Sequence, residues 1–134
     1  MSVVEGYVAF SNVLNEDEYR GQSVGYNVTL CLEDSAKEAL EAEEVIVKEY
    51  HGVGQRKFKS KNRDYFDILD ENGSELQLSE ELPRGTKVRL LWNGGKEVNP
   101  QYGRSTYLSK LKVLEMGDGN IPLAFEGGDD NNDF

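Results

Sequence analysis

Strict alternation of apolar and polar side chains is the feature that most limits what this chain can fold into. Over residues 23–32 two sets of residues alternate: Val24, Tyr26, Val28, Leu30 and Leu32 with Gly25, Asn27, Thr29 and Cys31. A period of two is typical of a strand with one buried face. Segments rich in β-branched and aromatic residues predict further strands over residues 5–14, 56–70, 86–92 and 106–114.

Turn signals separate these segments. A polar turn is expected over residues 15–18, and Asn72-Gly73 predicts a hairpin leading into residues 75–78. Pro83-Arg84-Gly85 predicts another turn. Glycines and cations over residues 93–104 predict a flexible loop.

Only one segment favours a helix. Asp34 or Ser35 can cap it, Ser35 and Glu38 fit a capping box, and apolar residues recur at helical spacing as far as Tyr50, before Gly52 and Gly54 end it. A single helix does not supply the crossovers of a parallel sheet. Five or six strands with one inserted helix therefore predict a mainly β domain, an OB-fold-like Greek-key barrel, over residues 1–116. Residues 117–134 are expected to be a flexible acidic tail.

Composition narrows the chemistry. The 134 residues suit one domain, and a single Cys and a single His argue against a zinc site. Cys31 is expected to be structural in a reducing compartment, and His51, between Tyr50 and Gly52, is expected to be a turn residue. The sequence contains no glycine-rich phosphate-binding motif and no nucleophile elbow. We therefore predict a protein that is not an enzyme.

The distribution of charge matters more than the net value of −10. Acids dominate residues 33–49 and 116–134, whereas residues 56–63 carry five bases and no acid. Residues 84–112 carry seven bases against Glu97, so the two basic segments hold 12 of the 15 Lys and Arg residues. Aromatic residues are interleaved with these bases, which is the mixture that grips phosphates and stacks on unpaired bases.

These two segments supply the predicted DNA-binding residues. They are Arg56, Lys57, Lys59, Lys61, Arg63, Tyr65, Arg89, Trp92, Lys96, Tyr102, Arg104, Tyr107, Lys110 and Lys112. In an unbroken strand the odd-numbered residues from Lys57 to Tyr65 share the outer face, while Phe58, Phe66 and Ile68 face the core. The alternative interpretation is that the cations are solvated and the rings are buried in the core.

Several short motifs resemble those of the single-stranded DNA-binding proteins of podovirus-type (T-seven-like) phages. The segments that show this resemblance are residues 26–30 before an acidic helix, 57–59, 85–89, 102–103 and 111–115, together with an acidic C-terminus ending in an aromatic residue. The resemblance implies an OB-fold core that binds single strands without sequence preference and acts in phage DNA replication, recombination and repair. It also implies no cofactor, a place in the cytoplasm of the infected bacterium, and a homodimer as an open alternative.

The same resemblance assigns a role to the C-terminus. Asp129, Asp130, Asp133 and Phe134 are expected to bind replication proteins, namely the DNA polymerase and the helicase-primase. Other functions stay open at this point: an OB-fold RNA-binding module, a protein-interaction barrel, or a small hydrolase with a carboxylate metal site.

Overall fold

A computed structural model of the chain describes residues 1–101 and 103–121. Its elements, in chain order, are β1 (Ser2–Tyr19), β2 (Gln22–Leu32), α1 (Asp34–Glu41), β3 (Lys48–Tyr50), β4 (Val53–Ser60), a 3-10 turn (Arg63–Tyr65), β5 (Asp67–Leu69), β6 (Lys87–Asn99) and β7 (Gly103–Glu115). Within these described ranges, no helix is long and apolar enough to cross a membrane.

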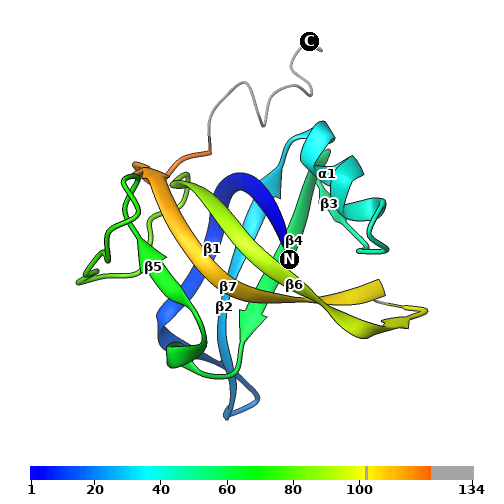
Figure 1. Ribbon diagram of the computed structural model, residues 1–134, viewed down its shortest axis with the longest axis horizontal. Coiled ribbons are helices and arrows are strands. Elements are labelled where there is room, and N and C mark those ends of the chain that lie inside the picture. The colour runs from blue at the N-terminus through cyan, green and yellow to red at the C-terminus, as the bar shows by residue number, and fades with distance from the viewer. Residues whose placement is uncertain (102, 122–134) are drawn as a thin grey trace.

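The strands form one sheet in the order β3-β4-β2-β1-β6-β7-β5 (Figure 1). A further parallel pairing joins β4 to β7, and it closes β1, β2, β4, β7 and β6 into a five-stranded barrel. The helix follows the second barrel strand. The predicted OB-fold-like barrel with one inserted helix is therefore confirmed.

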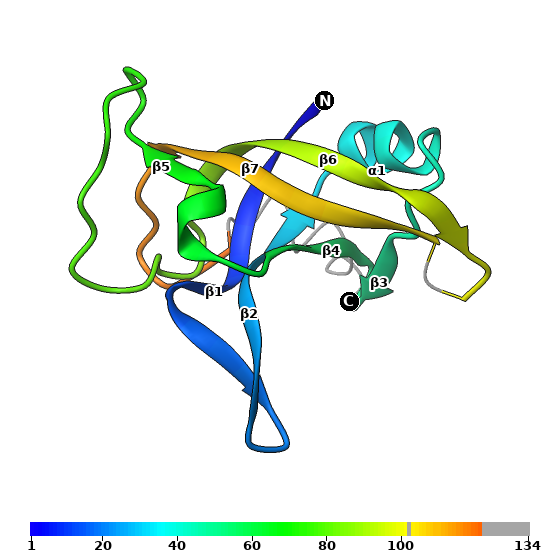
Figure 2. The ribbon, with the colours of Figure 1, turned by 60° about the horizontal axis from the view of Figure 1, so that its bottom comes forward.

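The first hairpin is longer than predicted, and the polar turn expected at residues 15–18 is wrong. Strand β1 continues through these residues and pairs with β2 as far as Tyr19 and Gln22. The chain reverses at Arg20-Gly21, where φ is 54° and 81°. Two positive φ values suit the turn types that match the twist of a hairpin. The outer part of this hairpin is a projecting arm (Figure 2), on which Val24 is 50% exposed instead of buried.

An irregular stretch of β1, between Asn12 and Asp17, leads into the arm. The carboxylate of Glu81 lies against it and accepts hydrogen bonds from the backbone N–H groups of Val13, Leu14 and Asn15, at 2.8, 3.0 and 2.9 Å. The side chains of Ser11 and Asn15 also donate to this carboxylate. Glu81 thus fastens the connection between β5 and β6 to the root of the arm.

The predicted helix is too long, and its predicted cap is wrong. Glu33 occupies the N-cap position with no side-chain hydrogen bond, and the helix ends at Glu41. The consecutive β-branched residues Val45-Ile46-Val47 favour extended backbone, which explains the early end. The following strand β3 turns into β4 at His51-Gly52, where φ is 55° and 82°, so His51 is a turn residue as predicted.

Past β4 the predicted strand breaks up. Phe58, Phe66 and Ile68 are buried as predicted, but extended pairing stops at Ser60 and the 3-10 turn follows. Asn72-Gly73 does form a tight turn, with Gly73 at φ 86° and its N–H donating to Asp70. Only a single bridge, between Leu69 and Glu75, represents the expected hairpin.

The loop expected at residues 93–104 is a β-hairpin instead. Strand β6 runs to Asn99, and β7 returns from Gly103 with Val98 paired to Arg104 (Figure 2). The two adjacent glycines have a packing role in it. A side chain at Gly94 would collide with Arg104, and one at Gly95 would contact the ring of Tyr107.

Two clusters of buried side chains hold the barrel together. The larger fills the interior around Phe58 and Trp92, whose rings pack edge to face with centroids 6.0 Å apart. The smaller joins Ala9 and Cys31 to Ile121. Backbone N–H groups of Gly117 and Gly119 bond to Thr86 and Arg84, so residues 117–121, beyond the boundary predicted at residue 116, dock on the barrel.

Candidate nucleic-acid interface

Strand register places a defined group of side chains on the outer surface of β1, β2, β4 and β7. In one row Phe10 pairs with Thr29, and Thr29 pairs with Lys57. In the next, Asn12 pairs with Asn27, Asn27 with Lys59, and Lys59 with Tyr107. Paired residues share a face of the sheet. We call this surface the lysine face: Phe10, Asn12, Asn27, Thr29, Lys57, Lys59 and Tyr107.

The lysine face is cationic, since its seven residues include two lysines and no carboxylate. The Lys59 Nζ lies 5.6 Å from the centroid of the Tyr107 ring, which remains 39% exposed. A phosphate at Lys59 would therefore sit beside an accessible ring. Lys61 follows the same outward parity after β4 ends and is also exposed.

A carboxylate bounds the lysine face at the root of the arm. The Asn27 Nδ2 donates to Asp17 Oδ2 at 3.0 Å, and the Asn27 Oδ1 accepts from the Asn12 Nδ2 at 3.4 Å. Asn27 is only 3% exposed, so it serves to tie the arm to the face. Glu16 and Glu18 flank Asp17 on the arm, which makes the arm a poor path for phosphates.

Arg56 has a structural role that differs from the predicted phosphate contact. Its guanidinium donates to Thr106 Oγ1 at 3.0 Å and to the carbonyls of Ile46 and Arg104 at 3.0 and 2.8 Å. Burial lowers the pKa of Arg56. These bonds fasten β4 to β7 where the barrel closes, so its donors already have partners.

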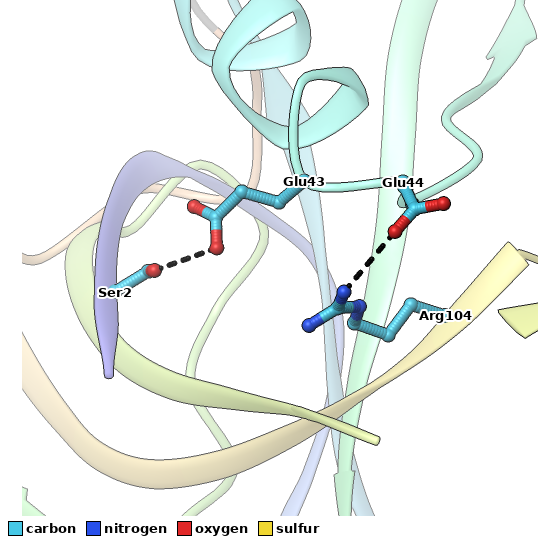
Figure 3. A network of polar contacts seen from close by, with 4 residues as sticks. All are labelled: Ser2, Glu43, Glu44 and Arg104. Atoms are coloured by element: carbon cyan, nitrogen blue, oxygen red, sulfur yellow. Dashed lines mark hydrogen bonds and ion pairs between the residues drawn. The ribbon is translucent and has the colours of Figure 1, made fainter. Parts of the chain in front are cut away.

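Arg104 is held in a similar way. Its guanidinium forms an ion pair with Glu44 at 3.2 Å (Figure 3). Its backbone N–H also donates to the Glu44 carbonyl. The neighbouring Glu43 accepts a hydrogen bond from Ser2 Oγ at 2.9 Å. The segment after α1 therefore binds β1 on one side and β7 on the other, and its acid offsets the charge of Arg104.

Three predicted cations lie elsewhere, on the outer surface of β6 and β7. Arg89 pairs with Lys112, and Lys110 pairs with Leu91. Carboxylates stand in the same rows. Glu5 forms a 2.6 Å ion pair with Arg89, and Asp67 of β5 is the register partner of Lys110 on β7. The structure therefore separates this partly neutralised group from the lysine face.

The remaining predicted residues are scattered. Trp92 is 1% exposed and packs on Phe58, so it is a core residue and has no face free for stacking. Tyr65 is 66% exposed on the 3-10 turn, whereas Arg63 stacks on Phe66 and donates to its carbonyl. Lys96 is exposed on the β6–β7 hairpin. Tyr102 and the four tail residues Asp129, Asp130, Asp133 and Phe134 lie outside the described residues.

Phe10 is an aromatic residue of the lysine face that the sequence pattern missed. Its ring is 61% exposed in the middle of a barrel strand, in the same row as Lys57. In a regular strand Phe10 would share the inward face of Val8. Only an irregularity in pairing brings it outside, and no residue type in the sequence signals that irregularity.

A closed five-stranded barrel of this kind belongs to the OB-fold class, in which the face of the second and third strands and the adjoining hairpins bind oligonucleotides or oligosaccharides. In this chain those strands are β2 and β4, and β4 carries both lysines of the lysine face. No family model and no curated protein matches the sequence. Structural similarity is more informative, and it points to two proteins of bacteriophages.

One is the single-stranded DNA-binding protein from bacteriophage Enc34 in complex with ssDNA, with a TM-score of 0.62, 13% identity, and coverage of 87% of this chain and 88% of that one. The other is gp2.5, a single-stranded DNA-binding protein encoded by bacteriophage T7, with a TM-score of 0.59, 14% identity, and coverage of 87% and 92%. At such identities the similarity establishes the fold. It confirms the fold that the sequence resemblance implied.

Proposed function

We propose that this protein binds single-stranded DNA without sequence preference through the lysine face. The observation that carries the proposal is the paired row in which Lys59 stands beside the accessible ring of Tyr107, with Lys57 in the next row. Lysines attract the phosphates of any sequence, and every base can stack on a ring. A duplex keeps its bases stacked inside, so exposed rings favour an unpaired strand.

The fold and the C-terminal sequence support a proposal for the wider role. The protein would coat single strands during phage DNA replication, recombination and repair, inside the infected bacterium, without catalysis. Both similar structures are of phage single-stranded DNA-binding proteins. The residues Asp129, Asp130, Asp133 and Phe134 would recruit the DNA polymerase and helicase-primase, and a homodimer is compatible with this role.

The place where the tail begins supports its action as an internal competitor for DNA. Ile121 packs with Cys31, which lies on β2 two residues from Thr29 of the lysine face. Two strand residues span about 7 Å. The acids Glu126, Asp129, Asp130 and Asp133 follow Ile121 by 5 to 12 residues in the sequence, so their effective concentration at the lysine face would be high.

Gel-shift titrations with oligo-dT, oligo-U and duplex DNA over a range of salt concentrations test the proposal. Three exposed lysines, Lys57, Lys59 and Lys61, predict a slope of log affinity against log salt of about −2, at roughly −0.7 for each phosphate on a single strand. Tighter binding to oligo-U would favour an RNA-binding module. No binding to either single strand would favour a protein-interaction barrel and refute the proposal.

A further inference from the structure

A β-bulge at Ala9 reverses the direction of the next side chain. Val8 pairs with Leu30, and Phe10 pairs with Thr29, so β1 advances two residues where β2 advances one. Val8 and Ala9 are both buried, at 0% and 4% exposure, whereas Phe10 is 61% exposed. Bulges re-aim side chains in this way and are frequent beside functional sites.

The bulge puts Phe10 at one edge of the lysine face, opposite Tyr107. Three strand spacings separate β1 from β7 across the face, a span of about 14 Å at ~4.8 Å for each spacing. The two lysines lie between the rings, on β4. A strand of DNA that crosses the barrel strands would therefore meet an aromatic ring at each edge and cations between them.

A small cluster of buried side chains supports the bulge. Ala9 packs in the smaller cluster with Cys31 and Ile121, and Ile121 is 5% exposed. Residues 117–121 are fixed by the hydrogen bonds of Gly117 and Gly119 to the turn at residues 84–86. The approach is so close that a side chain at Gly85 would collide with the Asn120 carbonyl, and one at Gly117 with the backbone of Gly85.

We propose that Phe10 stacks on a base of the bound strand, and that Ile121 is a positioning residue that holds the Ala9 bulge in the form that presents Phe10. This inference rests on the proposed function and adds to it a stacking residue outside both basic segments. It also makes the root of the tail a working part of the DNA-binding domain. Loss of the root should weaken binding, although loss of the acids beyond it should tighten binding.

Oligo-dT affinity of full-length variants tests the stacking role. Phe10→Ala should bind about 5- to 150-fold more weakly, the range for loss of one base–aromatic stack. Phe10→Leu, which keeps an apolar side chain without a ring, should be similarly weak. Phe10→Trp should bind like the unchanged chain, with its fluorescence quenched by DNA above the constant signal of buried Trp92. If Phe10→Ala binds normally, Phe10 does not stack, whereas failure of the unchanged chain to bind refutes the proposed function itself.

A double-mutant cycle tests the role of Ile121. Ile121→Ala should weaken binding in the unchanged chain and have no further effect when Phe10 is already Ala. Ile68→Ala, a truncation in the main core, serves as the control and should lower thermal stability without coupling to Phe10. Independent effects of Phe10→Ala and Ile121→Ala would overturn the positioning role. If Ile121→Ala does not fold, Ile121→Val repeats the same cycle with a smaller loss.

Discussion

Replacing both lysines of the lysine face should remove two phosphate contacts and little else. Lys57 and Lys59 have exposed side chains, and their inward neighbours Phe58 and Ser60 carry the packing. In Lys57→Gln/Lys59→Gln the slope of log affinity against log salt should become shallower by about 1.4, or ~0.7 for each contact on a single strand. At about 0.1 M salt, tenfold below the 1 M reference, this corresponds to roughly 25-fold weaker binding.

Fluorescence anisotropy with a labelled oligo-dT, repeated over a series of salt concentrations, measures both quantities. The matched control is Lys37→Gln/Lys48→Gln, which removes the same charge from α1 and β3. A second comparison, Arg89→Gln/Lys112→Gln, removes two cations from rows that contain Glu5, and it should change the slope less. An equal loss in all three variants would show that net charge, and not the lysine face, governs binding.

Four further results are expected. Deletion of residues 127–134 should tighten binding to oligo-dT, most at low salt where screening is weakest. Weaker binding after this deletion would make the tail part of the DNA site. Phe134→Ala should leave DNA affinity unchanged and reduce capture of the replication polymerase or helicase. Glu81→Ala, which leaves three backbone N–H groups without their acceptor, should lower the free energy of unfolding by about 1–3 kcal/mol in urea titrations, and an unchanged midpoint would contradict this anchoring role. Trp92→Ala should cost about 3–5 kcal/mol of stability as a core truncation, and a folded variant defective only in DNA binding would contradict its place in the core.

The barrel could be predicted because its strands carry their burial pattern in the sequence. Val28, Leu30, Val88, Leu90 and Trp92 alternate with less buried residues, and all five are buried. The hairpin arms could not be predicted in this way, because strands exposed on both faces have no apolar face to reveal them. Residues 15–18 and 93–99 look like polar loops for that reason, yet both are strands.

The candidate site was predicted in part, because parity on β4 is regular. The odd-numbered Lys57 and Lys59 lie outside and Phe58 lies inside, as expected. The structural bonds of Arg56 and Arg104 could not be predicted, for a physical reason. Their partners are backbone carbonyls and a glutamate distant in sequence, so a cation that bonds the barrel together looks the same in sequence as one that is free to meet a phosphate.

Charge balance in the folded chain explains how a protein of net charge −10 can offer a surface to DNA. Many acids of the described residues lie on α1, on the segment after it and on the arm, where Asp17 marks the edge of the lysine face. Some of them offset cations there, as Glu44 does for Arg104 and Glu5 for Arg89. Lys57 and Lys59 stand in rows without a carboxylate. Their position in the sheet therefore distinguishes them from the cations that an acid offsets. Repulsion by the acids elsewhere should therefore direct an approaching anion to the lysine face, and we expect the acids of residues 126–133 to compete with it for that face.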